Sequence, residues 1–207
     1  IRYSQYYGSD GQHYTGSVTA AGAVDITATA GSINDATADA IADVVGSSVT
    51  LTAGSGIGSG EALEFADSAS VNASVTGTGN INLQGLGALT LGNANTAAGS
   101  ITVGAAGLLT ATSVTTNTSG IIDLDTSSGG IIATSVGSAD TASITAAAGD
   151  ITLGSVTAVN AVDITSTAGS INDATTDLVV ADVSGSAITL IAATGIGSTQ
   201  ALEFVDS

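Results

Sequence analysis

Short runs in which apolar and polar residues alternate recur along almost the whole chain. Examples are VDIT at 24–27, INLQ at 81–84, IDLD at 122–125 and ITL at 151–153. Alternation with a period of two is the pattern of a β-strand that buries one face and exposes the other. Val, Ile and Thr favour such strands, and Gly with β-branched residues interrupts every window that might form a helix. The pattern therefore predicts an all-β fold.

These strands recur with a short repeat, in which a small residue, usually Gly, stands just before an Ile. The isoleucines are Ile33, Ile57, Ile81, Ile101, Ile131, Ile151, Ile171 and Ile196, and a further SGI at Ile121 divides the longest interval between them. Second strands such as VTLT at 49–52 lie about half a period away. A short strand-and-corner repeat of this kind is typical of coils stacked with parallel strands.

We therefore predict a β-solenoid, a right-handed parallel β-helix of about nine coils of 20–25 residues, because parallel crossovers are overwhelmingly right-handed. The alternative is a β-sandwich built from hairpins, whose usual turns are Asn-Gly or Asp-Gly pairs. The only such pair, Asp10-Gly11, lies outside the repeats. The solenoid is the better interpretation.

A much longer repeat contains the short one. AVDITATAGSINDATADAIADV at 23–44 returns as AVDITSTAGSINDATTDLVVADV at 161–183, and VTLTAGSGIGSGEALEFADS at 49–68 returns as ITLIAATGIGSTQALEFVDS at 188–207. The offset between the copies grows by one position at an insertion near Leu178. We interpret this unit of about six coils as a duplicated block, so that 23–68 are repeated at 161–207. The second copy ends at Ser207, where the first copy continues, and we expect further coils or another subunit to follow.

Composition and charge exclude several classes of partner. The chain has 207 residues, with 18 acidic residues against a single Arg and no Lys, which gives a formal charge of −17. Nucleic acid is excluded as a partner because nothing replaces the counterions of the phosphates. No run approaches the roughly 18 apolar residues of a membrane span, so we expect no membrane insertion. The 43% of apolar residues argue against a disordered acidic tail.

Three segments carry a resemblance to a known family: AGSITVG at 98–104, AGDITLGSV at 148–156 and VDITSTAGSI at 162–171. They are similar to the repeats of filamentous haemagglutinin-type exoproteins and related large bacterial surface adhesins, over approximately residues 16–207. The resemblance implies a secreted, extracellular shaft on the bacterial cell surface. The part that guides secretion in that family is not recognisable here, so the secretion route stays open.

Residues 1–16 form an atypical segment before the solenoid, which we place at 17–207. This segment holds all four tyrosines and the only His and Arg of the chain, namely Arg2, Tyr3, Tyr6, Tyr7, His13 and Tyr14. One interpretation is a junction that adds a strand to the open edge of a neighbouring subunit. A second is a carbohydrate-binding or contact patch, since Tyr offers flat apolar area with a polar group. The third is a cap that closes the first coil.

The INDATAD segment and its copy INDATTD are the candidates for a metal site. They supply Asn34, Asp35 and Asp39, and then Asn172, Asp173 and Asp177. Carboxylates gathered at a turn suit Ca²⁺, which takes six to eight oxygen ligands. The alternative is structural, because Asn and Asp also cap turns by binding their own backbone. Asp123 and Asp125, with Asp150 in a later coil, form a second candidate ladder for cations. We expect no other cofactor.

The sequence favours a structural protein over an enzyme. The function we expect is the shaft of a bacterial surface adhesin or a self-assembling cell-surface fibre. Its partners would be copies of itself joined end to end or further coils of the same chain, and glycans of a host or neighbouring cell. The alternative is a β-helical protein that binds or degrades polysaccharide, in which paired Asp carboxylates would act alone. Against an enzyme, the acidic residues recur at repeat positions, as Asp25 with Asp163 and Asp67 with Asp206 do.

Overall fold

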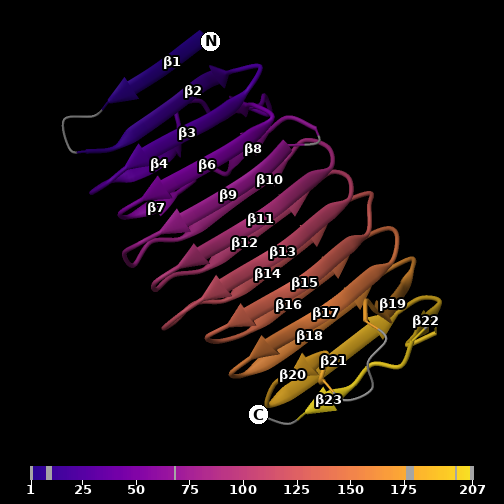
Figure 1. Cartoon of the computed structure of the whole chain (residues 1–207). Coiled ribbons are helices and arrows are strands. Elements are labelled where there is room, and N and C mark those ends of the chain that lie inside the picture. Colours follow the sequence, from indigo (N-terminus) through magenta and orange to yellow (C-terminus); the bar gives the residue numbers. More distant parts are fainter. Residues whose placement is uncertain (1, 8–10, 68, 176–179, 199, 206–207) are drawn as a thin grey trace.

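The computed structural model describes residues 2–7, 11–67, 69–175, 180–198 and 200–205. They form a parallel β-solenoid of about nine coils, which climbs as a rod with the two chain ends at opposite ends (Figure 1). The predicted all-β solenoid is confirmed, while its right-handed sense stays a prediction. No helix among the described residues is long and apolar enough to cross a membrane.

Each regular coil gives one strand to each of two sheets, and of the strand pairs that the structure describes all but one are parallel. The 12-stranded sheet contains β1 (Arg2–Tyr7), β2 (His13–Thr19), β4 (Ser32–Asp35), β5 (Val44–Val45), β7 (Gly56–Ile57), β8 (Leu63–Phe65), β10 (Ile81–Gly85), β12 (Ile101–Ala105), β14 (Ile122–Thr126), β16 (Ala142–Ala146), β18 (Ala161–Ser166) and β21 (Ala187–Ala192). The 11-stranded sheet contains β3 (Ala23–Ala28), β6 (Ser48–Ala53), β9 (Ala69–Val75), β11 (Leu89–Thr96), β13 (Leu109–Thr116), β15 (Ile131–Ser138), β17 (Ile151–Ala158), β19 (Ser170–Asp173), β20 (Val183–Ser184), β22 (Gly195–Ile196) and β23 (Phe204–Val205).

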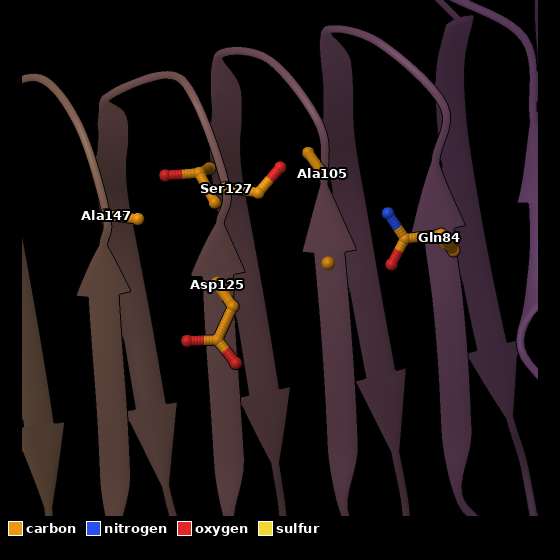
Figure 2. Close-up of a pocket in the computed structure, with 7 residues that line it drawn as sticks. Gln84, Ala105, Asp125, Ser127 and Ala147 are labelled. Atoms are coloured by element: carbon orange, nitrogen blue, oxygen red, sulfur yellow. The ribbon is translucent and has the colours of Figure 1, made fainter.

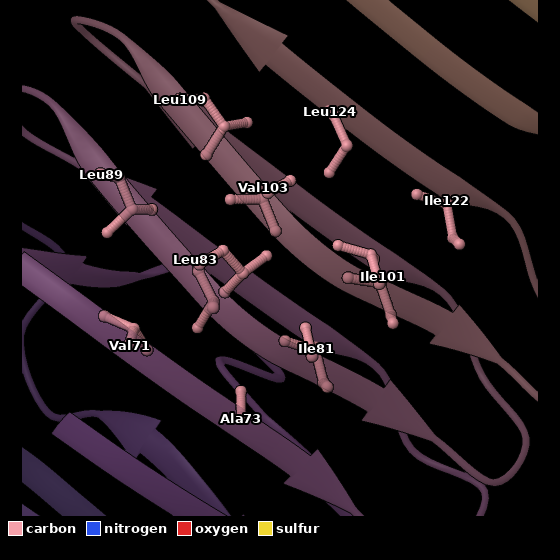
Figure 3. Packing of buried hydrophobic residues seen from close by; sticks show 14 of the residues in the cluster. Val71, Ala73, Ile81, Leu83, Leu89, Ile101, Val103, Leu109, Ile122 and Leu124 are labelled. Carbon is pink, nitrogen blue, oxygen red and sulfur yellow. The ribbon is translucent and has the colours of Figure 1, made fainter. Parts of the chain in front are cut away.

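The core lies between the sheets and consists of like side chains stacked coil over coil. Ile81, Ile101 and Ile122 are successive register partners in one sheet, and Leu89 pairs with Leu109 in the other. These side chains are fully buried, and Figure 3 shows them pointing into the space between the strands. Mostly aliphatic residues fill this narrow interior, together with Phe65, because the alternating pattern turns every second side chain inward.

The corners between the sheets explain the abundance of Gly and Thr. At Gly99 the backbone has a φ of 152°, and a Cβ there would overlap the carbonyl oxygen of Gly79 in the preceding coil. Buried hydroxyls at the strand ends satisfy other corner carbonyls: Thr96 Oγ1 donates to Gly79 O over 2.9 Å, and Thr126 Oγ1 donates to Gly129 O over 2.7 Å. The coils therefore approach closely only where side chains are small or hydroxylated.

Two regions depart from the regular coils, and they are the two copies of the long repeat. In each copy, two successive strands are interrupted at a point where a regular strand continues. In the first copy the interrupted strands, β4–β5 and β7–β8, belong to the 12-stranded sheet; in the second copy β19–β20 and β22–β23 belong to the 11-stranded sheet. The duplicated block thus spans about six and a half coils, where the sequence suggested about six, and corresponding strands of its two copies lie on opposite sheets.

The N-terminal segment joins the solenoid earlier than the proposed boundary at residue 17. β2 begins at His13, and His13 and Thr15 are register partners of Ile33 and Asp35 in β4. β1 runs antiparallel to β2, with Tyr6 opposite Tyr14. The backbone of β1 therefore occupies the outer edge of β2, which is the arrangement that a cap requires.

Candidate functional site

The interrupted strands of the first copy carry two stacked loops. Residues 36–43 leave the sheet after β4 and return at β5, and residues 58–62 leave after β7 and return at β8. β4 pairs with β7 through Ile33 and Ile57, and β5 pairs with β8 through Val44 and Phe65. The loop ends are therefore held one above the other by the strands on both sides.

Three carboxylates meet at the base of these loops. Asp35 ends β4, Asp43 precedes β5 and Glu64 lies in β8, and one carboxylate oxygen of each lies within 4.8 Å of the others. Asp43 is 1% exposed and Glu64 is 9% exposed. We call these three residues the first cluster.

Backbone amides hold the first cluster in place. Asp43 Oδ2 accepts a hydrogen bond of 2.9 Å from Glu64 N, and Asp35 Oδ1 accepts one of 2.8 Å from Thr37 N. The second oxygen of Asp35, Oδ2, is buried and accepts no hydrogen bond from the described residues. Backbone amides thus hold one oxygen of Asp35 and one of Asp43, while the second oxygen of Asp35 stays buried as an unused acceptor.

The second copy builds the same arrangement on the opposite sheet. Asp173, Asp182 and Glu203, the second cluster, again bring carboxylate oxygens within 4.8 Å of one another. Asp182 Oδ2 accepts a hydrogen bond of 3.0 Å from Glu203 N, and Asp173 Oδ1 accepts one of 2.7 Å from Thr175 N. Asp173 Oδ2 is buried and accepts none from the described residues.

Burial disfavours charge on the carboxyls of the first cluster. It raises the pKa of Asp43 from 3.8 to about 9, and the neighbouring Asp35 carboxylate adds to this rise. Burial also raises the pKa of Glu64, with Asp35 and Asp39 adding to the effect. A buried carboxylate needs a proton or a positive partner.

The sequence placed only part of these clusters. Asp35 and Asp173 were predicted as ligands and belong to them, whereas Asp43, Glu64, Asp182 and Glu203 were missed. The signal was present, because ADV and ALEF carry an acidic residue at the same place in both copies.

The other predicted ligands have structural partners or lie elsewhere. Asn34 Oδ1 accepts a hydrogen bond from Ser59 N over 3.3 Å, and Asn172 Oδ1 accepts one from Ser198 Oγ over 3.0 Å, so each Asn contacts the second loop of its copy. Asp39 is exposed and accepts from Ile41 N over 2.8 Å, which is a turn cap. Asp177 lies outside the described residues.

The predicted ladder of outward carboxylates is not continued from coil to coil, although Asp123 and Asp125 are neighbours on β14. Asp123 pairs with Ser143, and Ser143 pairs with Asp163, so a neutral residue separates the two carboxylates. Asp150 lies in a corner, where hydrogen bonds from Ser170 N and Oγ, both 2.7 Å, lower the pKa of its carboxyl. These residues form no common site.

Asp125 lines an open depression on the outside of the 12-stranded sheet (Figure 2). It forms because Gly104 lies between Gln84 and Asp125 in register and has no side chain. Partial desolvation raises the pKa of the Asp125 carboxyl, as does nearby Asp123, although Asp125 as a whole is exposed. The lining residues include no aromatic ring on which a sugar would stack.

In the Tyr-rich segment, His13 is buried and Tyr14 is half-buried. Burial lowers the pKa of the His13 imidazole. The side chains of Arg2, Tyr3, Tyr6 and Tyr7 lie outside what the structure describes, so a junction role for this segment stays a prediction.

We compared the chain with protein-family models, curated protein sequences and solved structures, and none of the three comparisons found a match. The assignment of function therefore depends on the geometry of the chain itself.

Proposed function

We propose that this chain forms a stiff structural rod outside a bacterial cell, as the shaft of a surface adhesin or as a segment of a cell-surface fibre. The observation that carries the proposal is the unbroken axial stacking of the coils. From β10 to β18 every strand of the 12-stranded sheet pairs in register with its neighbours in the coils on both sides. A stack of equivalent layers grows in length with each coil and holds what it carries at a fixed distance.

The distribution of charge supports an exposed rod. The chain carries a formal charge of −17, yet no two acidic residues are register partners in the strand pairs that the structure describes. Stacking like charges in adjacent strands would destabilise the sheet. Spaced charge keeps the coils together and opposes side-by-side aggregation of rods.

The end of the rod that carries the second copy supports continuation by another coil. Ile196 and Phe204 are 46% and 51% exposed, whereas their counterparts Ile57 and Phe65 are fully buried. In the first copy, β10 covers this surface by pairing with β7 and β8. We propose that a further coil covers the equivalent surface of the second copy, supplied by the same chain in a shaft.

The test is to lengthen the rod by a known amount. Residues 69–207 are added again after Ser207, once and twice, and particle length is measured by negative-stain electron microscopy and small-angle X-ray scattering. Six and a half coils at ~4.8 Å predict a gain of about 31 Å per block at constant width. An added block that widens the particle, or leaves its length unchanged, would overturn the proposal that the chain forms a rod.

Two further measurements address the assembly and the location. If the chain is part of a shaft, micrographs of the natively isolated protein should show discrete rods. Filaments with a subunit repeat would instead show that separate subunits polymerise end to end. Gold-labelled antibody should bind the surface of intact cells that make the protein. Label confined to the cell interior would overturn the extracellular assignment.

A further inference from the structure

We propose that each carboxylate cluster binds one calcium ion, so that the described chain carries two equivalent calcium sites on opposite sheets. The first site consists of Asp35, Asp43 and Glu64, and the second consists of Asp173, Asp182 and Glu203. The proposal does not depend on the proposed rod function. It shares only Asp35 and Asp173 with the set that the sequence suggested, and its other four ligands come from the structure.

The unsatisfied oxygen of Asp173 is the first observation that points to a ligand. Asp173 is only 6% exposed, its Oδ1 is bound by Thr175, and its buried Oδ2 accepts no hydrogen bond from the described residues. Its carboxylate lies within 4.8 Å of those of Asp182 and Glu203. Because Asp173 is the register partner of the core residue Leu153, its side chain lies at an inward position next to apolar neighbours. A bare acceptor in such a place is costly.

The sequence supplies no basic side chain that would neutralise the second cluster. The chain has no Lys, and its only Arg and His, Arg2 and His13, lie in β1 and β2 at the other end of the rod. Neutralising the negative charge gathered here therefore requires protons or a cation taken from solution.

The recurrence of the geometry in two different settings is the second observation. In the first cluster, Asp35 pairs in register with Thr15, and β10 covers the cluster. In the second cluster, Asp173 pairs with Leu153, and no described coil covers the cluster. The same backbone hydrogen bonds form in both. The arrangement is therefore built by the repeated loops, and among the described residues no other group of three acidic side chains comes this close together.

The donor chemistry selects calcium. All ligands are hard carboxylate oxygens, which exclude the nitrogen and sulfur environment typical of zinc. Two oxygens bound to one Ca²⁺ at 2.3–2.6 Å are at most about 5 Å apart, and the cluster oxygens lie within 4.8 Å. Water would complete the shell, which Ca²⁺ accepts in irregular geometry, whereas Mg²⁺ requires a tighter octahedron.

The position of the ion gives it a structural role. Asp35 precedes the loop 36–43, Asp43 is its last residue, and Glu64 belongs to the following coil. One ion therefore closes the loop at its base and ties two coils together, and the second ion does the same through Asp173, Asp182 and Glu203. A ligand that binds only the folded arrangement stabilises it by mass action.

The experiment is calorimetric titration of the chelator-treated full chain with CaCl₂, and separately with MgCl₂. We expect two calcium ions per chain with submillimolar affinity, one ion for each of Asp43→Asn and Asp182→Asn, and none for the double variant. Asn keeps the oxygen that accepts the amide of the next coil and removes the charge, so these variants should fold. Circular dichroism checks the fold of each.

The matched control is the double variant Asp123→Asn with Asp163→Asn, which removes two outward carboxylates and the same charge. It should retain both ions. Hydrogen exchange at 36–43 should also slow when calcium is added to the unchanged chain and should not slow in Asp43→Asn. The absence of calcium binding, equal loss of binding in the control, or retained binding in the cluster double variant would each overturn the proposal. Preference for Mg²⁺ would overturn the assignment to calcium.

Discussion

The two copies of the long repeat have almost the same sequence and the same local geometry, but they differ in burial. Gly58 N donates to Ile33 O over 2.8 Å, and Gly197 N donates to Ile171 O over the same distance. Yet Phe65 is fully buried and Phe204 is half exposed. The fold of each coil is therefore determined by its own residues, whereas the burial of its apolar face depends on the next coil.

The two copies also show that the solenoid accepts one sequence on either sheet. The strand AVDIT lies in the 11-stranded sheet as β3 and in the 12-stranded sheet as β18. Both positions turn Val and Ile inward, and Asp outward, because alternation alone decides the facing. The second copy of the block is therefore offset from the first by half a coil, and the same residues of this strand still face the core.

The largest expected difference between the copies is at the buried phenylalanine. Phe65→Ala should lower the free energy of unfolding by about 3–5 kcal/mol, because it leaves a cavity between coils. Phe204→Ala should cost about 1 kcal/mol or less, because half of that ring already contacts water. Urea unfolding followed by circular dichroism measures both.

The comparison at phenylalanine has its own control. When residues 69–85 are added after Ser207, the new coil should cover Phe204, and the cost of Phe204→Ala should rise toward that of Phe65→Ala. Equal costs in the original chain would show that the neighbouring coil does not determine burial.

A second matched pair separates backbone strain from contact with the next coil. Gly58 and Gly197 both have a φ of 64°, so Ala is strained equally at each. A Cβ at Gly58 would also overlap the carbonyl oxygen of Asn82, whereas the nearest contact at Gly197 is 3.2 Å. Gly58→Ala should therefore cost about 1–3 kcal/mol more than Gly197→Ala. Thermal unfolding of the two variants gives the difference, and equal melting temperatures would contradict it.

The sequence predicts the regular coils well and the clusters poorly, for a physical reason. Alternation and Gly corners are local, so strands such as 81–85 and 101–105 and their stacking follow directly. The partners of Asp35 are Asp43, at the far end of a loop, and Glu64, in the following coil, and only the stacking of two loops brings them to its carboxylate. Glu64 is also misleading, because strict alternation between Leu63 and Phe65 would place it outside, yet it is 9% exposed.

The half-turn between copies is equally hidden in the sequence. Because the length of a coil varies along the chain, the distance from Ala23 to its counterpart Ala161 is compatible with six coils or with six and a half. Either sheet accepts the same strand, so no residue marks the difference. The interruptions after β4 and after β19 reveal it only once each strand is assigned to a sheet.

The covered first copy should also produce a dependence of stability on pH. The folded chain holds a proton on Asp43 up to about pH 9, while the unfolded chain releases it near 3.8. Unfolding between these values releases a proton, so this stabilisation is complete below about pH 4 and is lost as the pH rises toward 9. In calcium-free buffer the free energy of unfolding should fall by at least about 1 kcal/mol over this range. Asp43→Asn should flatten that part of the profile, and an unchanged slope would contradict the assignment.

The smallest expected effect is one in which the two copies should agree. Thr50 and Thr189 are counterparts, both exposed, and they are the register partners of the outward residues Asp25 and Asp163. Thr50→Asp and Thr189→Asp each place two carboxylates in adjacent strands, which should cost about 0.2–1 kcal/mol in either copy. Because both sites face water, the cost should shrink in concentrated salt. Thermal unfolding at low and high salt tests this, and a much larger cost in the first copy would mean that the next coil reaches the outward face as well as the core.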